Sequence, residues 1–379
     1  MINRKYWHAV IEKAWKARPV IWLAGVRRVG KTCLTQSLDN VEYFDCELPR
    51  VRQMMQDPQD FWDGLNGKRV ILDEIHRLDN PSQLLKIAAD HYPKIRVIAT
   101  GSSTLGASSK FRDTLAGRNT NLWLTPVTLA DMRDFDETNL KRRLLHGGLP
   151  PFFLSDAMPE AELQEWMDAY WAKDIQELFR LEKRSAFQKL TELLMIQSGG
   201  MFEAKSLAQP CGISQPTVAN YVKVLEETFV VHVIRPFHGR NAKEIVSAPK
   251  IYAFDTGFVC YYRGWTSLRP KDMGELWEHF VLNEIHAATQ SRTVGYWRDK
   301  QKHEVDFIWS PRGRAPMAIE CKWSAGEFNA GNLHVFRQEH PTGENIVVAH
   351  DVDRSFKRTF GGMVVHFENT EGLTRRLLS

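Results

Sequence analysis

The sequence predicts an α/β protein that begins with a parallel sheet covered by helices on both faces. Four short apolar runs indicate strands: residues 20–24, 41–45, 69–72 and 96–100. Helical spacing of apolar residues precedes the first run, and Asn80 followed by Pro81 starts another helix between the last two runs. Strands that alternate with helices in this way are typical of a parallel sheet.

The first strand leads into a glycine-rich loop at residues 25–32, Gly-Val-Arg-Arg-Val-Gly-Lys-Thr. A glycine, four residues and Gly-Lys-Thr between a strand and a helix form the pattern of a phosphate-binding loop. The glycines let successive N–H groups point at phosphate oxygens, and the start of the next helix adds unpaired donors. We expect Lys31 to reach the outer phosphates and the Thr32 hydroxyl to hold Mg²⁺. The predicted nucleotide-binding residues are Gly25, Arg28, Val29, Gly30, Lys31, Thr32 and Cys33.

A second motif, Arg-Val-Ile-Leu-Asp-Glu at residues 69–74, is an apolar strand that ends in two carboxylates. We expect Asp73 to orient Mg²⁺ together with Thr32, and Glu74 to polarise the water that attacks the outer phosphate. Each feature alone has an ordinary explanation, a chance glycine-lysine match or a cap between a strand and a helix. Their joint occurrence predicts a protein that binds and hydrolyses ATP or GTP, with Mg²⁺ as cofactor.

Two further stretches are expected near the nucleotide. Residues 100–103, Thr-Gly-Ser-Ser, follow the fourth strand, and nucleotides bind at the carboxyl edge of open parallel sheets. Ser102 or Ser103 would sense the outer phosphate or position the attacking water, unless the serines form only a turn that caps a helix. Arg118 would either reach a phosphate across a subunit boundary, as an arginine finger, or pair with a structural carboxylate.

The order of these motifs, followed by Gly-Gly-Leu-Pro-Pro at residues 147–151, resembles a widespread family of bacterial and archaeal AAA-type ATPases. That family carries a C-terminal domain of unknown function, and its ATPase part is similar to the AAA+ branch related to origin-recognition and signalling NTPases. Val26 and Cys33 depart from the family pattern, where proline and threonine are common, without removing a phosphate or metal ligand. The resemblance covers nearly the whole chain, and it implies ATP as the nucleotide and assembly into an oligomer such as a hexameric ring.

The composition is typical of a globular protein. The 379 residues are 43% hydrophobic and 25% charged, and a chain of this length suggests two or three domains. The net charge of +4 permits an anionic partner without requiring one. The cysteines form no C-x-x-C pair, the N-terminus lacks the apolar core of a signal peptide, and no apolar run approaches a membrane span. We therefore expect a cytoplasmic protein with no structural zinc and no membrane partner.

The middle of the chain predicts a winged helix. Pro150 and Pro151 mark the predicted end of the ATPase domain, and a helical segment with aromatic anchors follows. A short helix, a turn at Gly212, Ser214 as the cap of a second helix and a strand then complete the winged-helix outline. The second helix holds one lysine against two glutamates, which argues against base readout by that helix. Cations just after it are candidates for phosphate contact: Arg235, His238, Arg240 and Lys243. The alternative is a winged helix used for packing between domains or subunits.

The last third holds a second constellation. Two strand-like runs place Asp306 before a hairpin turn and Glu320-x-Lys322 after it. Alternation on a strand puts Glu320 and Lys322 on one face, and the hairpin brings Asp306 beside them. Two carboxylates would hold Mg²⁺ while the lysine orients or helps deprotonate an attacking water.

This order matches the pattern of the restriction-endonuclease-like (PD-(D/E)xK) nuclease fold, whose further acid comes from a preceding helix. Glu278 is the first choice for that acid, and Glu284, nearly two turns on, is the competing choice. The candidate cations near this face are Arg298, Lys300 and Lys302.

The sequence thus predicts an ATPase domain at residues 1–150, a helical linker and winged helix at 151–245, and a nuclease-like α/β domain at 246–379. The leading hypothesis is a DNA-binding ATPase that couples nucleotide state to DNA processing. Branched DNA is suggested because the E-x-K arrangement resembles that of archaeal Holliday-junction resolvases. One alternative is a signalling-type switch whose nucleotide controls binding of a protein partner. Another is an ATP-dependent DNA nuclease, which differs from the first in whether the E-x-K site cuts.

Overall fold

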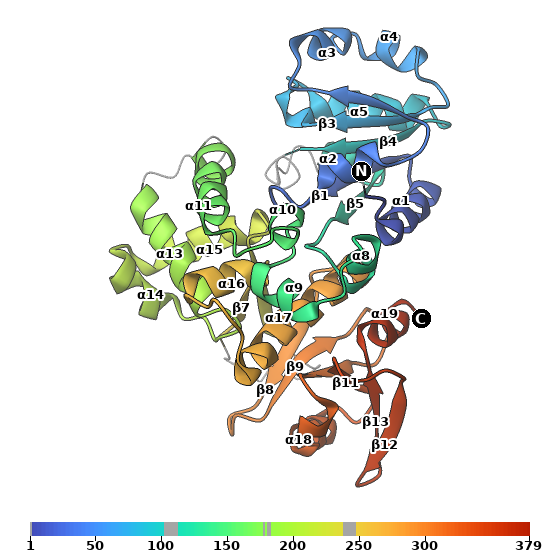
Figure 1. The fold of residues 1–379 in the computed structure, drawn as a ribbon. Helices are drawn as coiled ribbons and strands as arrows, with labels where there is room; N and C mark the ends of the chain where they lie inside the picture. The colour runs from blue at the N-terminus through green and yellow to red at the C-terminus, as the bar shows by residue number, and fades with distance from the viewer. Residues whose placement is uncertain (1, 102–112, 177–178, 180–182, 238–247) are drawn as a thin grey trace.

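A computed structural model of the chain describes residues 2–101, 113–176, 179, 183–237 and 248–379 (Figure 1). Five of the predicted site residues lie outside the described residues: Ser102, Ser103, His238, Arg240 and Lys243. Within the described ranges, no helix has the combined length and apolar character that crossing a membrane requires.

The first sheet holds, among the described residues, five parallel strands in the order β2-β3-β4-β1-β5. The strands are β1 (Val20–Ala24), β2 (Val41–Asp45), β3 (Arg69–Asp73), β4 (Arg96–Thr100) and β5 (Asn119–Trp123). In strand β1, which has a neighbour on each side, alternation sends Val20 and Trp22 to one face and Ile21 and Leu23 to the other. All four side chains are buried, so both faces of the sheet need a cover.

Helices cover both faces, because the apolar side chains of β1 belong to two different cores. One core receives α1 (Lys5–Ala17) and α2 (Lys31–Gln36). The other core receives α3 (Pro49–Met54), α4 (Pro58–Asp63) and α5 (Pro81–His91), while the short 3-10 helix η1 (Ile75–Arg77) follows β3. Figure 1 shows α3 and α4 above this sheet and α1 below it. The predicted α/β class with a parallel, helix-covered sheet is therefore confirmed.

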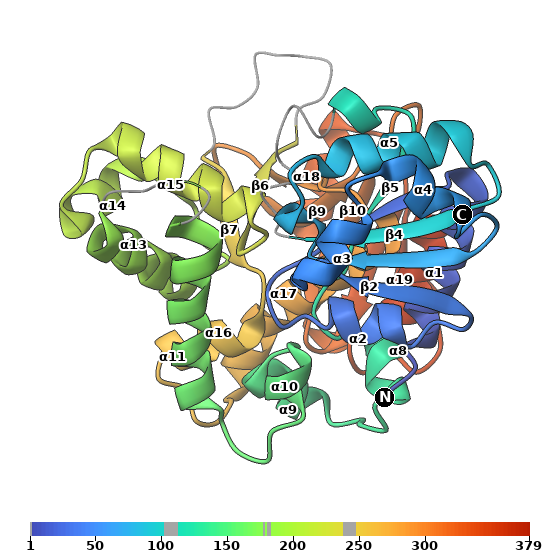
Figure 2. The same cartoon turned by 90° about the horizontal axis from the view of Figure 1, so that it is seen from above.

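Helices make up most of the middle of the chain (Figure 2). They are α8 (Leu129–Asp134), α9 (Leu140–His146), α10 (Pro150–Phe153), α11 (Glu160–Ala169), the π-helix η2 (Tyr170–Gln176), α13 (Arg184–Ile196), α14 (Ala204–Cys211), α15 (Gln215–Glu227) and α16 (Thr256–Tyr262). Gly212 takes a left-handed conformation at the end of α14, and the Ser214 hydroxyl accepts the Thr217 N–H at the start of α15. The two helices therefore have the expected turn and cap, while the winged helix as a class stays a prediction.

A second, mixed sheet runs through the C-terminal part and holds eight of the described strands, in the order β12-β13-β11-β10-β9-β8-β6-β7. They are β6 (Val231–Pro236), β7 (Lys250–Ala253), β8 (Gly295–Arg298), β9 (Glu304–Trp309), β10 (Met317–Lys322), β11 (Asn345–Ala349), β12 (Phe356–Phe360) and β13 (Met363–Glu368). The accompanying helices are α17 (Pro270–Thr289), η3 (Ala325–Glu327), α18 (Gly331–Glu339) and α19 (Thr370–Leu378). Because β6 pairs with both β7 and β8, the strand that completes the predicted winged-helix outline is part of this sheet.

The Gly-Gly-Leu-Pro-Pro stretch has a packing explanation. The Gly148 N–H donates to Asp255 Oδ2 at 2.5 Å, directly before α16. Gly147 has φ +88°, and a Cβ on it would collide with the Asp255 carboxylate. These glycines therefore let the end of α9 approach α16, and the following prolines start α10.

Three segments of the chain meet around Trp123 at the end of β5. Its ring lies 5.0 Å from the His232 ring of β6 and 4.7 Å from the His286 ring of α17. Burial, together with the charge of Arg292, lowers the pKa of His286 to about 3. Neither ring nitrogen of His286 has a hydrogen-bond partner among the described residues, so a proton there would be costly.

We expect the free energy of unfolding to decrease as pH falls below about 6.5, where histidines of the unfolded chain become protonated. His286 stays neutral in the folded state down to about pH 3. The unfolded state therefore binds more protons in this window, which lowers stability by up to about 1.4 kcal/mol per pH unit for each such histidine. Urea denaturation at pH 7 and pH 5 should show a smaller pH effect in His286→Phe than in the parent. An equal pH effect in both proteins would contradict this assignment.

Candidate active site

The phosphate loop and the Asp73-Glu74 pair meet at one edge of the first sheet. Neighbouring strands β3, β4 and β1 are parallel, so their carboxyl ends lie together. A cavity of about 820 Å³ opens there and is lined by Gly25, Lys31 and Thr32 as well as by the two acids. The structure thus brings the two predicted motifs to a single cavity.

The glycines of the loop are required by its backbone. Gly25 has φ +149°, and a Cβ on it would lie 2.7 Å from the Leu124 carbonyl oxygen. Gly30 has φ +98° and immediately precedes α2. The Lys31 ammonium donates to the carbonyls of Gly25 at 2.9 Å and Val26 at 3.2 Å, so it lies within the loop. Burial lowers the pKa of Lys31, and the Glu74 charge opposes that change.

Asp73 is held by hydroxyl groups from three elements. Thr32 Oγ1 donates to its Oδ2 at 2.8 Å, and Tyr43 Oη donates to the same oxygen at 2.6 Å. The Thr100 hydroxyl donates to Oδ1. Thr32 and Asp73 therefore face one another across the start of α2, as the predicted shared metal site requires.

Glu74 sits just beyond the strand in a left-handed conformation, with φ 53°. Its carboxylate lies 3.1 Å from His76 Nδ1. Burial would raise the pKa of Glu74, but the hydrogen bond from His76 and the charge of Lys31 together lower it. An ionised carboxylate at the mouth of a phosphate site is suited to orient or polarise water.

The metal predicted at this site can be tested against the residues present. Mg²⁺ prefers oxygen ligands and commonly binds one or two protein groups together with substrate phosphates. Thr32 and Asp73 supply such oxygens at the cavity wall, so they fit a Mg²⁺ ion that arrives with a nucleotide. No group of three or more His, Cys, Asp or Glu side chains in the described part of the chain is arranged to hold a metal by itself.

Helix α11 and the π-helix η2, from the middle of the chain, contact the phosphate loop. Arg27 Nε lies 3.0 Å from Asp174 Oδ2, and the Trp166 indole donates to the Arg27 carbonyl at 2.9 Å. Arg28, predicted to bind nucleotide, forms an ion pair with Glu165 at 3.0 Å. Asp174 also lines the cavity, so both the first sheet and the middle helices form the site.

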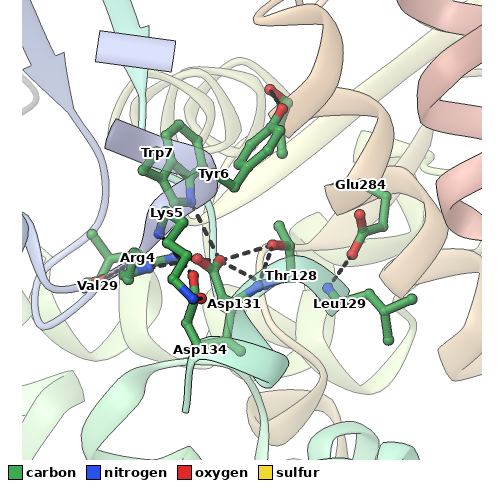
Figure 3. A network of polar contacts seen from close by, with 12 residues as sticks. Arg4, Lys5, Tyr6, Trp7, Val29, Thr128, Leu129, Asp131, Asp134 and Glu284 are labelled. Carbon is green, nitrogen blue, oxygen red and sulfur yellow. Dashed lines mark hydrogen bonds and ion pairs between the residues drawn. The ribbon is translucent and has the colours of Figure 1, made fainter. Parts of the chain in front are cut away.

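Arg4, close to the N-terminus, also contacts the phosphate loop (Figure 3). The Arg4 guanidinium makes two bonds to Asp131, at 2.8 and 2.7 Å, and donates to the Val29 carbonyl at 3.2 Å. Asp131 also accepts from the backbone and hydroxyl of Thr128 at the start of α8. Because Arg4 and Asp131 are almost completely buried, this network fixes the position of the loop carbonyl at Val29. Val29 itself is buried, while Cys33 is exposed and lines the cavity.

Arg118 lies apart from the cavity. Its guanidinium forms a two-point ion pair with Asp90 of α5, at 2.6 and 3.1 Å. Within one chain, Arg118 therefore pairs with a structural carboxylate, which is the second of the two roles expected from the sequence. Its role as an arginine finger toward a second subunit stays a prediction.

The second constellation also comes together in space. Lys322 Nζ lies 2.8 Å from Glu320 Oε2 and 3.6 Å from Asp306 Oδ2. Asp306 accepts the Cys321 N–H at 2.8 Å, which fixes it beside β10. Of the two helix acids, Glu278 lies on the side of this cluster: it accepts the Tyr252 hydroxyl at 3.0 Å, and the Tyr252 ring lies 5.7 Å from the ring of Phe307, next to Asp306. Burial and the Asp306 charge raise the pKa of Glu278 to about 8. Glu284 instead accepts the Leu129 N–H at 2.7 Å, at the start of α8.

The carboxylates of this cluster are poorly compensated. Burial and the Asp306 charge also raise the pKa of Glu320 to about 8, and its buried Oε1 has no partner among the described atoms. Lys322 retains its charge because Asp306 and Glu320 outweigh its burial and raise its pKa. Oxygen-only ligands suit a hard cation such as Mg²⁺, but the three acids would have to draw closer to share one.

The candidate DNA-binding cations differ in their surroundings. Arg235 is held by Glu226 through two contacts of 3.0 and 3.1 Å, and Arg298 lies 3.0 Å from Glu304. Lys300 and Lys302 are exposed. Two of the four described candidates are therefore neutralised within the chain.

Sequence reasoning missed several residues that complete the nucleotide cavity. Tyr43, His76 and Asp174 contact the predicted motifs, yet each comes from a separate element and belongs to no local pattern. Thr100 is different, because it belongs to the Thr-Gly-Ser-Ser stretch that the sequence had already placed near the nucleotide.

Comparison with known proteins supports the first part of this interpretation. Residues 17–132 match the model of the AAA domain family. This segment, which contains the phosphate loop and Asp73-Glu74, is thereby supported as an AAA-type P-loop domain. Residues 137–269 and 273–367 match two families described as domains of unknown function, DUF8612 and DUF4143. The winged helix and the nuclease-like fold therefore stay predictions.

Two mycobacterial relatives extend beyond the AAA segment. The uncharacterized proteins Rv2008c of Mycobacterium tuberculosis and Mb2031c of Mycobacterium bovis are each 28% identical over 334 residues. The alignment covers 85% of this chain and 74% of each relative.

Similarity to solved structures is distant. A signal transduction ATPase with a tetratricopeptide repeat sensor from Pyrococcus horikoshii has 12% identity and a TM-score of 0.31, covering 76% of this chain and 47% of that chain. Cdc6p from Pyrobaculum aerophilum has 10% identity and a TM-score of 0.25, covering 69% of this chain and 92% of that chain.

Proposed function

We propose that the protein binds and hydrolyses ATP with Mg²⁺ at the cavity between the first sheet and the middle helices. The observation that carries this proposal is the convergence of Lys31, Thr32, Asp73 and Glu74 on one cavity. The loop N–H groups and Lys31 would bind the phosphates, and Thr32 with Asp73 would hold Mg²⁺, which supplies charge neutralisation. Glu74, whose pKa is lowered, would orient the attacking water.

We further propose that nucleotide state is coupled to DNA processing in an oligomer. The support is the mildly basic chain, with net charge +4, and the exposed Lys300 and Lys302, which precede β9 in the chain. A nucleotide-controlled protein partner is the alternative, favoured by the ion pairs that occupy Arg235 and Arg298. Each phosphate that the protein neutralises makes DNA affinity fall by about one power of salt concentration, whereas a protein partner would show little such dependence.

The deciding experiment is the ATP hydrolysis rate with Mg²⁺, measured alone and with single-stranded, duplex and four-way-junction DNA. Stimulation by one DNA form would support the coupling and identify the substrate. Hydrolysis that is indifferent to every form would favour the protein-partner switch, and no hydrolysis above the Glu74→Gln blank would reject the ATPase proposal.

The second candidate function is DNA cleavage by the cluster of Glu278, Asp306, Glu320 and Lys322. One observation favours it: two buried acids, Asp306 and Glu320, lie beside Lys322, and Glu320 Oε1 has no partner among the described residues. Such a cluster is costly in a protein that does not use it. The roles would be metal binding by the acids and orientation of water by the lysine.

We expect Mn²⁺ to raise the melting temperature of the parent more than that of Asp306→Asn, because the acids gain a counter-charge when the ion binds. Both proteins should be measured with the Lys31→Ala change, which removes any metal effect through nucleotide. Asp168→Asn, at an exposed ion pair, is the matched control and should respond like the parent. Equal shifts in all three proteins would count against a working nuclease site. So would a failure of the protein with intact Lys31 to nick any DNA form in the presence of ATP and Mn²⁺.

A further inference from the structure

The wall of the nucleotide cavity has two chemically different halves. The phosphate loop, Asp73 and Glu74 form a polar half. Five further lining residues, Ile2, Phe135, Pro150, Pro151 and Leu154, form an apolar part that we call the apolar half, and Tyr170, Lys173 and Thr228 are among the other residues that line the cavity. None of these five side chains carries a hydrogen-bond donor or acceptor.

The apolar half begins directly at the phosphate loop. A Cβ built on Gly30 would lie 3.6 Å from Pro150 Cγ and 3.7 Å from Arg4 Nη1, so the proline rests over the loop glycine. Phe135 packs edge to face on Phe153, with ring centres 5.9 Å apart. Phe153 is completely buried in α10, so it anchors the helix that carries both prolines. The apolar half is therefore a supported surface rather than a loose loop.

Two of its members remain accessible. Ile2 is 39% exposed and Leu154 is 48% exposed, although both are large apolar side chains. An apolar ligand that covers them would gain free energy in proportion to the area removed from water. A ligand whose phosphates lie on the loop and whose flat apolar part reaches this wall is a nucleotide, with its base against these side chains.

We propose that Ile2, Phe135, Pro150, Pro151 and Leu154 form the base subsite of the nucleotide cavity, and that this subsite discriminates weakly between adenine and guanine. This inference rests on the proposed nucleotide binding. Discrimination between isosteric ligands in an apolar site is limited to about 10²-fold, whereas sites with buried hydrogen-bonding groups reach about 10⁴–10⁵-fold. The Arg4 guanidinium, which lies beside Gly30, already donates to Asp131 and to the Val29 carbonyl.

The test compares ATP with inorganic tripolyphosphate, which has the phosphates but no base. Calorimetric titration in a Glu74→Gln background prevents hydrolysis. We expect Leu154→Ser and Ile2→Ser each to weaken ATP binding about five- to 20-fold and to leave tripolyphosphate binding unchanged. The matched control is Met54→Ser, which removes an apolar side chain of similar exposure, 55%, outside the cavity. It should change neither affinity.

The remaining outcomes would each contradict a stated part of the proposal. Equal losses for both ligands would overturn the base subsite, because the residues would then act through the phosphate loop, and unchanged ATP affinity would place the base elsewhere. An ATP-to-GTP affinity ratio above about 10² would overturn the weak discrimination. Binding of tripolyphosphate without ATP would reject the subsite alone, whereas binding of neither ligand would reject the proposed nucleotide site itself.

Discussion

Glu74→Gln is expected to lower the ATP hydrolysis rate by about 10²–10⁴-fold while nucleotide affinity stays within a small factor of the parent. The carboxylate lies beside the cavity, is ionised because its pKa is lowered, and is oriented by His76 at 3.1 Å. Glutamine keeps the shape of the side chain but cannot accept a proton or polarise water as strongly. The readouts are the steady-state hydrolysis rate and the dissociation constant for ATP with Mg²⁺.

The matched control is Glu42→Gln on β2, which removes an exposed partner of Lys68. It should retain parental hydrolysis. Lys31→Ala should behave differently from both, because removal of the ammonium weakens binding as well as hydrolysis. A Glu74→Gln enzyme that keeps more than a tenth of the parental rate would contradict the role assigned to Glu74.

Asp131→Ala is expected to lower the free energy of unfolding by about 3–5 kcal/mol, because it leaves the buried Arg4 guanidinium without its counter-charge. The pair is almost completely inaccessible, and Asp131 also accepts from Thr128 and the Trp7 indole. The network in Figure 3 would lose Asp131, the acceptor that joins Arg4 to Thr128. Urea denaturation, monitored by tryptophan fluorescence, measures the change.

The comparison variant is Asp168→Ala, whose partner Arg184 is about half exposed. An exposed pair contributes less than about 1 kcal/mol, so this variant should be close to the parent. The double variant Arg4→Met with Asp131→Leu should recover part of the loss, because no isolated charge remains buried. Similar losses for the two aspartates would show that burial of the Arg4 pair does not determine its contribution.

The local motifs could be predicted from the sequence because the residues that form each motif are close together in the chain. Gly25 and Gly30 are both favoured by positive φ values, and Gly25 also by the close approach of the Leu124 carbonyl; that requirement is visible as glycine at fixed spacing. Glu320 and Lys322 share a face because alternate residues of a strand do, and the structure places them 2.8 Å apart. The alternation of strands and helices similarly predicted the parallel sheet.

Only the tertiary structure decided which distant residues join these motifs. Glu278 and Glu284 are six residues apart on α17 and point about 120° apart around the helix, so the sequence allowed either to serve as the helix acid. Packing of α17 put Glu278 near Asp306 and Glu284 against α8. Arg4 and its partner Asp131 are 127 residues apart. Such partners are set by burial and charge compensation across the fold, and no local spacing encodes them.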